Sequence, residues 1–169
     1  MDTLRDGSQV TIRPICKGDI ELERQFIERL SPEARRYRFL YTIATPSDSL
    51  LRRLTDIDAE NEAALIAVID EGLHQREVGV ARFSRTPDGR AEVAVTVDGD
   101  WQGRGLATLL MQRLIAVARE RGIRALFSID PAGNDRMRGL AASLGFQRRP
   151  DPQDATQVIY TLTLEAQQP

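Results

Sequence analysis

The chain has 169 residues, and its 23 Lys and Arg against 25 Asp and Glu give a formal net charge of −2 at pH 7. This length fits one domain of ordinary size, so we expect a single domain over residues 1–169. The balanced charge provides no basic field to attract nucleic acid or an anionic membrane, and neither is expected as a partner. The longest apolar run, residues 63–69, is far shorter than the roughly 20 residues that cross a bilayer.

The start of the chain and its soft metal ligands exclude further classes. Acidic and polar residues stand where a secretory signal has a basic flank and an apolar core, which indicates a cytoplasmic protein. Cys16 is the only cysteine and His74 the only histidine, so we expect no internal disulfide, no zinc cluster and no metal cofactor. Isolated residues of these two types more often pack or face solvent than catalyse.

The first third of the chain predicts one strand and two helices. Residues 9–15 alternate apolar and polar side chains, as a strand does, and residues 17–31 place apolar residues at helical spacing. Ser47 or Asp48 can cap a second short helix that carries Leu50, Leu51 and Leu54.

Between those helices, residues 30–41 carry an apolar stripe at helical spacing, formed by Leu30, Ala34, Tyr37 and Tyr41. Three arginines lie off this stripe: Arg35, Arg36 and Arg38. They either face water or meet an acidic surface of an acceptor.

The middle of the chain predicts an antiparallel meander. Residues 62–70, 76–84 and 90–97 are rich in Val, Ile and Ala, as strands are. Pro87 presets φ and Gly89 accepts a positive φ, so the last two strands should form a hairpin.

The C-terminal half predicts helix, strand, helix and strand in turn. Residues 106–122 have the strongest helical stripe and end at a glycine; strand 123–129, helix 134–145 and strand 156–164 follow. The expected fold class is α+β (mixed α/β), with a central mixed sheet that begins as an antiparallel meander and is flanked by helices.

A glycine-rich loop joins strand 90–97 to the strongest helix. A helix N-terminus presents unpaired N–H groups and partial positive charge, which favour phosphate. Gly103 and Gly105 let the backbone approach an anion closely, and Arg104 can add a charge-assisted contact. A tight turn without any ligand is the alternative.

Two nucleotide classes compete for this loop. A P-loop needs a lysine after its second glycine, and none is present, which disfavours nucleotide hydrolysis. A dinucleotide fingerprint has Thr108 in place of its third glycine, while Asp130 ends the next strand where the fingerprint has an acid. An NAD-binding oxidoreductase therefore stays an alternative, although the loop follows a hairpin and leaves too little chain for further parallel units.

Residues 101–115 resemble the pyrophosphate-binding segment of the GNAT superfamily of acyl-CoA-dependent N-acetyltransferases. The superfamily pattern Gln/Arg-x-x-Gly-x-Gly/Ala is filled by Gln102, Gly105 and Ala107. The following helix of the superfamily and its Gly-Phe ending are matched by Asn134, Met137, Leu140, Gly145 and Phe146. The resemblance is close over residues 91–146 and extends in element order over 8–164. Within the superfamily, residues 30–40 and 90–110 are similar to bacterial protein-lysine acetyltransferase domains.

The resemblance implies a twisted central sheet, acetyl-CoA as co-substrate and transfer of an acetyl group to a primary amine. It places the pantetheine arm on the backbone of Val95, Thr96 and Val97. The pyrophosphate would be held by Gln102, Gly103, Arg104, Gly105, Leu106, Ala107 and Thr108. Asn134 falls where the family has an asparagine that contacts the cofactor, and Met137 follows it on the same helix.

The resemblance also implies a general base. A lysine with a pKa of about 10.4 is only about 0.1% neutral near pH 7.4, so a base that removes its proton is useful. By alternation, Glu92 shares a strand face with Ala94 and Thr96. Periodicity alone indicates only an exposed strand glutamate, whereas some protein acetyltransferases have their catalytic glutamate at this position.

One position departs from the family pattern. Many GNAT enzymes have a tyrosine seven residues after the asparagine that acts as general acid on the leaving thiolate, and here that residue is Ala141. No general acid is therefore assigned. Either the coenzyme A thiolate leaves without a side-chain acid, which a thiol pKa of about 8.5 allows, or another group serves. Asp98, Asp100 and Asp130 are turn or strand-end residues, and a direct role for each is the less favoured alternative.

The acceptor and the assembly stay open at this level. A protein lysine is the favoured acceptor, a small-molecule amine is the nearest alternative, and a non-catalytic acyl-CoA-binding sensor is a third possibility. Exposed strand edges are compatible with a homodimer.

Overall fold

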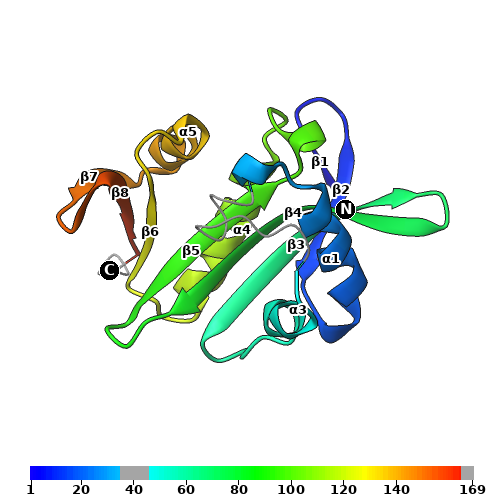
Figure 1. Cartoon of the computed structure of the whole chain (residues 1–169), viewed down its shortest axis with the longest axis horizontal. Helices are drawn as coiled ribbons and strands as arrows, with labels where there is room; N and C mark the ends of the chain where they lie inside the picture. Colours follow the sequence, from blue (N-terminus) through cyan, green and yellow to red (C-terminus); the bar gives the residue numbers. More distant parts are fainter. Residues whose placement is uncertain (35–45, 165–169) are drawn as a thin grey trace.

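An eight-stranded sheet forms the centre of the molecule, in the order β1-β2-β3-β4-β5-β6-β8-β7 (Figure 1). The computed structural model describes residues 1–34 and 46–164. The strands are β1 (Asp2–Thr3), β2 (Gln9–Pro14), β3 (Glu62–Glu71), β4 (His74–Arg85), β5 (Arg90–Val97), β6 (Ala125–Pro131), β7 (Gln147–Asp151) and β8 (Asp154–Thr163). The helices are α1 (Ile20–Arg29), α3 (Asp48–Thr55), α4 (Leu106–Glu120) and α5 (Asp135–Leu144), with 3-10 turns η1 (Lys17–Asp19) and η2 (Gly99–Trp101).

The predicted fold class is confirmed, because the sheet is mixed and helices cover it. Every neighbouring pair of strands is antiparallel except β5 and β6, which are parallel. No helix within residues 1–34 and 46–164 is long and apolar enough to span a bilayer.

Local signals correctly predict most elements. Ser47 caps α3 by accepting a hydrogen bond from the Leu50 N–H at 3.0 Å. The β4–β5 turn closes through Thr86 and Arg90, and Gly89 has the expected positive φ of 83°. The two tyrosines of the stripe predicted over residues 30–41, and the three arginines predicted beside it, lie outside the described residues.

Two strands are absent from the sequence-based prediction. β1 has only two residues, and β7 has the sequence QRRPD, in which charge and a proline hide any alternation. β7 forms because β8 offers it a partner: Gln147 pairs with Thr161 and Arg149 with Ile159. A strand that depends on its neighbour leaves no local hydrophobic pattern.

The two faces of the sheet bury separate hydrophobic cores. α4 packs on one face with Leu106, Leu110 and Leu114, and α1 and α3 pack on the other with Phe26 and Leu51 (Figure 1). We call these the α4 face and the α1/α3 face.

β5 and β6 separate shortly after they meet. Their parallel pairing covers only Arg90–Ala125, Ala91–Leu126 and Glu92–Phe127, and β6 then continues beside β8 (Figure 1). Beyond Glu92, no strand within residues 1–34 and 46–164 pairs with the edge of β5 that faces β6. The sheet is therefore open at its centre, which places a cavity there.

Candidate active site

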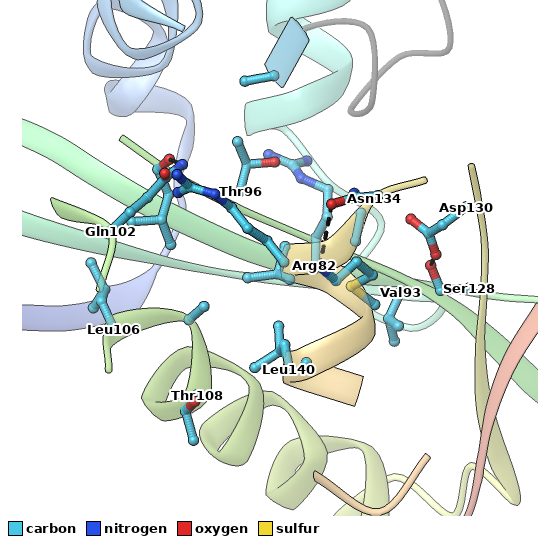
Figure 2. Close-up of a pocket in the computed structure, with 18 of the residues that line it drawn as sticks. Arg82, Val93, Thr96, Gln102, Leu106, Thr108, Ser128, Asp130, Asn134 and Leu140 are labelled. Carbon is cyan, nitrogen blue, oxygen red and sulfur yellow. Dashed lines mark hydrogen bonds between the residues drawn. The ribbon is translucent and has the colours of Figure 1, made fainter. Parts of the chain in front are cut away.

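A pocket of about 1060 Å³ occupies the opening between β5 and β6 (Figure 2). Its walls are residues 92–97 of β5, residues 128–130 of β6 and the N-terminal ends of α4 and α5. Every cofactor-binding residue predicted from the sequence lines it except Arg104. The topology therefore brings together segments that are separate in the chain.

The glycine loop presents a row of free donors at one end of the pocket. Gly103 and Gly105 have φ of 77° and 87°, the left-handed conformation that suits glycine, and Gly105 immediately precedes α4. In the described part of the chain, no group accepts a hydrogen bond from the backbone N–H of residues 103–108. Unpaired N–H groups at a helix N-terminus form an anion site, and a pyrophosphate fits this arrangement.

The unpaired edge of β5 leads from this loop toward Glu92. Val95, Thr96 and Val97 pair with β4 on one side only, so the groups on their other edge stay available for hydrogen bonding. The amides of a pantetheine arm can bond such an edge as an added strand would. Gln102 stabilises the end of this edge, since its Nε2 donates to the Val97 carbonyl at 3.2 Å.

Asn134 occupies the first position before α5. Its side-chain oxygen accepts from the Met137 N–H at 3.3 Å, which caps the helix and leaves the side-chain NH₂ available to the pocket. Both residues line the pocket, and Figure 2 shows Asn134 near its centre.

Arg104, which the sequence predicts to contact the anion, turns away from the pocket in this structure. Its guanidinium donates to Ser8 Oγ at 2.9 Å and to the Asp100 carbonyl at 3.0 Å, and it stacks on Trp101 at 4.3 Å. It does not line the pocket, because these contacts hold it against the N-terminal hairpin.

Arg5 is the cation that the sequence analysis missed. It lines the pocket from the β1–β2 hairpin, and its Nε lies 3.1 Å from the position that a Cβ on Gly105 would occupy. Within the described residues its guanidinium has no acidic partner. A separation of one hundred residues from Gly105 left no local signal for this contact.

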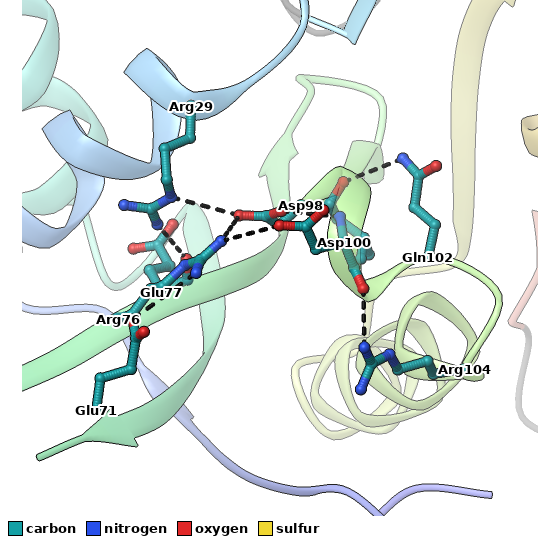
Figure 3. Close-up of polar contacts among 9 residues, drawn as sticks. Arg29, Glu71, Arg76, Glu77, Asp98, Asp100, Gln102 and Arg104 are labelled. Carbon is teal, nitrogen blue, oxygen red and sulfur yellow. Dashed lines mark hydrogen bonds and ion pairs between the residues drawn. The ribbon is translucent and has the colours of Figure 1, made fainter. Parts of the chain in front are cut away.

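Asp98 anchors the loop to the rest of the sheet (Figure 3). Its carboxylate accepts from Arg76 at 2.8 Å, from Arg29 at 3.4 Å and from the Asp100 N–H at 3.0 Å. Burial would raise the pKa of Asp98, but these bonds outweigh it and lower the pKa below its usual value. Asp98 is a structural residue, whereas Asp100 is exposed.

Glu92 faces the pocket from the α1/α3 face. It is exposed, while its neighbours Ala91 and Val93 are buried in the α4-side core. Strand register aligns Glu92 with Ser84 of β4 and Glu62 of β3, so three side chains form a row on one face. Two carboxylates in this row make that side of the pocket acidic.

Arg82 lies in the next row on the same face and is committed to structural contacts. Its Nη1 donates to the Leu54 carbonyl at 3.0 Å, and Nη2 lies 3.5 Å from the buried carboxylate of Glu23. Burial, followed by the charge of Glu23, raises the pKa of the adjacent Glu77 well above its usual value.

The remaining candidate residues from the sequence differ in whether they line the pocket. Asp130 lines the pocket and accepts a hydrogen bond from the Ser128 hydroxyl (Figure 2). Cys16 and His74 are exposed and do not line the pocket. Ala141 is buried in the core. Over residues 1–34 and 46–164 no group of His, Cys, Asp and Glu is arranged to hold a metal ion.

A mixed sheet that opens beside a glycine loop at a helix N-terminus is the arrangement of an acyl-CoA-dependent transferase, and sequence comparison defines the class. The model of the Acetyltransferase (GNAT) family matches residues 26–146, so the chain belongs to this family. It is an acetyl-CoA-dependent N-acetyltransferase.

Three proteins show how similar this chain is to individual acetyltransferases. Acetyltransferase PA5475 of Pseudomonas aeruginosa is 46% identical over 165 residues, covering 97% of this chain and 89% of that protein. The crystal structure of the GNAT domain of S. lividans PAT superposes with a TM-score of 0.88 at 30% identity, over 96% of this chain and 95% of that one. Acetyltransferase Pat of Mycolicibacterium smegmatis is 31% identical over 144 residues, 84% of this chain but 42% of that protein.

Proposed function

We propose that the chain transfers the acetyl group of acetyl-CoA to the side-chain amine of a protein lysine, with Glu92 as general base. The observation that carries this proposal is the exposed carboxylate of Glu92 in the pocket, beside the open edge of β5. In the described residues no cation or hydrogen-bond donor occupies that carboxylate, so it is free to accept a proton from an amine.

The two sides of the sheet support a division between donor and acceptor. Free backbone N–H groups and Arg5 favour the phosphates of acetyl-CoA at the loop. Glu62 and Glu92 on the α1/α3 face favour an ammonium group, which arrives charged and must lose a proton before it attacks. A small-molecule amine would also satisfy this chemistry and is the second candidate acceptor.

Replacing Glu92 with Gln should lower kcat/KM for a lysine-containing acceptor at least about tenfold near neutral pH. The defect should shrink at higher pH, where the amine deprotonates without help. We would measure acetyl-CoA turnover over a range of pH against a panel of lysine-containing proteins and small amines.

Glu60→Gln is the control, since Glu60 is an exposed acid that does not line the pocket. An unchanged pH–rate profile in Glu92→Gln would remove the base assignment. If the enzyme acetylates small amines but none of the lysine-containing proteins, the acceptor is a small-molecule amine and the proposed lysine acceptor is wrong.

A further inference from the structure

Beyond its first turn, α5 offers the leaving thiolate no acid. The residue that matches the family's tyrosine, Ala141, is only 1% exposed and does not line the pocket. The residues that α5 does turn toward the pocket beyond its first turn include Leu140 and Ser143, and neither has a carboxyl or phenol group. The Ser143 hydroxyl donates to the Leu140 carbonyl at 2.7 Å. Apart from Asp135 in the first turn of α5, a carboxyl group that could serve the sulfur stands on another wall of the pocket.

Asp130 lies on the opposite wall of the opening from the β5 edge. Glu92 and Phe127 are the last parallel pair, so residues 128–130 run along β6 where residues 93–95 run along β5. The backbone of Asp130 pairs with Val158 on its far side, and its carboxyl lines the pocket. Among the described residues this carboxyl has no cationic partner, and it accepts a hydrogen bond from the Ser128 hydroxyl (Figure 2).

Glu92 and Asp130 belong to opposite faces of the sheet. Leu126 is part of the α4-side core, and alternation along β6 gives Ser128 and Asp130 the same direction. Glu92 faces the α1/α3 side. One carboxyl group therefore lies on the side from which an amine arrives, and the other lies on the side of the phosphate loop.

The surroundings of Asp130 raise its pKa above the usual value for an aspartate. Burial raises the pKa of Asp130, the Ser128 hydroxyl works against this, and the negative charge of Glu92 adds to it, with a net rise above the usual value. The other charged groups that line the pocket are Glu62, Arg5, Arg82, Asp135 and Arg136. None of them contributes to this shift.

We propose that Asp130 is the general acid that protonates the sulfur of coenzyme A as the thioester bond breaks. The inference rests on the proposed function. The amine nitrogen forms the new C–N bond, the C–S electron pair goes to sulfur, and the proton of the Asp130 carboxyl follows it. Glu92 takes the proton that the amine loses. Because the acceptor arrives as an ammonium group, it loses two protons: Glu92 releases the first to solvent before the attack and takes the second as the C–N bond forms. Return of that second proton to Asp130 through solvent restores both carboxyl groups, so the reaction releases one proton overall.

The two carboxyl groups act in a favourable order. Once Glu92 is protonated, its negative charge no longer raises the pKa of Asp130. Asp130 thus becomes a stronger acid when the thiolate needs its proton, because the opposing negative charge is gone.

Kinetics of Asp130→Asn test this role. We expect kcat to fall at least about tenfold and the alkaline decline of the rate to disappear, because Asn has no proton to lose. Ser128→Ala should move the alkaline decline to higher pH, because the lost hydrogen bond had stabilised the carboxylate. An aryl thioester donor, whose thiol is more acidic, should reduce the defect of Asp130→Asn. Equal losses with both donors would show a structural role and overturn the proposal.

Asp154→Asn is the matched control. Asp154 also accepts from a nearby hydroxyl, that of Thr156 at 2.6 Å, and it is exposed outside the pocket. It should keep the rate, the pH profile and the donor dependence of the original protein.

A second measurement is independent of turnover. The thiol pKa of bound coenzyme A, followed by the ultraviolet absorbance of the thiolate, should be lower in Asp130→Asn than in the original protein, because a nearby carboxylate opposes a thiolate. An unchanged thiol pKa would mean that Asp130 does not reach the sulfur, whatever acceptor the enzyme uses. If the unsubstituted protein acetylates no amine at all, the proposed function is wrong, independently of the result for Asp130.

Discussion

Among single residues, Arg104 and Arg5 differ most from what the sequence suggests: Arg104 was expected at the anion site, and Arg5 was not. Arg104 stands inside the glycine loop but points to Ser8 and Asp6, and so holds the N-terminal hairpin in place. That hairpin carries Arg5, which reaches over Gly105. The residue next to the anion site in sequence is structural, and the residue distant in sequence faces the site.

Removal of Arg5 should weaken acetyl-CoA binding. A hydrogen bond to a charged group contributes about 1.5–3 kcal/mol, so Arg5→Ala should raise the KM for acetyl-CoA about tenfold or more. The salt dependence of binding should also fall, because one cation is lost. Steady-state kinetics at two ionic strengths would measure both effects.

Acetyl-pantetheine lacks the pyrophosphate, so comparing it with acetyl-CoA tests the contact between Arg5 and the phosphates. Arg5→Ala and the original protein should use it equally well. Arg119→Ala, an exposed substitution on α4 outside the pocket, is the control. A KM for acetyl-CoA that stays constant in Arg5→Ala would exclude a phosphate contact.

Among the elements, β4 and the end of α1 hold the start of the glycine loop in place through hydrogen bonds and ion pairs. Asp98 ends β5 and bonds Arg76 of β4 and Arg29 at the end of α1. Arg29 also donates to the Glu77 carbonyl at 2.7 Å. Gly79 permits the close approach of α4 to β4, since a Cβ there would lie 2.9 Å from Leu110. The loop is therefore held before any ligand binds.

Asp98→Asn should destabilise the fold by about 1–3 kcal/mol at neutral pH, because two buried arginine contacts lose their charged partner. The folded pKa of Asp98 lies below its unfolded value, so its stabilisation is present above the ordinary Asp pKa of about 3.9 and is lost as the pH falls through the folded value. Urea unfolding should show a difference at pH 7 that narrows below about pH 4.

Asp100→Asn gives the contrast, since the Asp100 side chain is 85% exposed and lies 3.8 Å from Arg76. It should unfold like the original protein. A constant difference for Asp98→Asn at every pH would mean that charge is not the cause.

At the scale of the whole molecule, one parallel pair of strands creates the site. β5 and β6 start side by side and separate, because β6 follows β8 and the β7–β8 hairpin rather than β5 (Figure 1). The opening exposes a strand edge in the middle of a sheet, where a ligand can complete the hydrogen bonds.

Acetyl-CoA should complete the sheet and stabilise the entire fold. At a concentration about one hundred times its Kd, a ligand adds about 2.7 kcal/mol, which corresponds to a rise in Tm of several degrees for a domain of this size. NAD should give no rise. Thermal unfolding with each ligand tests this, and stabilisation by NAD alone would contradict the acyl-CoA site.

Sequence reasoning succeeded where the signal is local. Leu106, Leu110 and Leu114 repeat at helical spacing and form the buried face of α4, and the alternation of β5 correctly exposes Glu92. β7 was missed because QRRPD has no period of its own. The glycine loop was located correctly, while the direction of Arg104 was wrong because it depends on Ser8 and Asp6.

Local signals in the sequence predicted every helix and strand described above except β1, β7 and the two short 3-10 turns, and they also located the glycine loop before α4 and pointed to the family. They could do so because helical and strand periodicity and the positive φ of glycine act over a few neighbouring residues. Only the tertiary structure decided which side chains meet at the pocket. Arg5 reaches Gly105, and Asp130 lies across the opening from the β5 edge, because sheet order makes distant segments neighbours. Local periodicity carries no information about that order. The side chains that share the pocket with Glu92 are therefore known only from the assembled sheet.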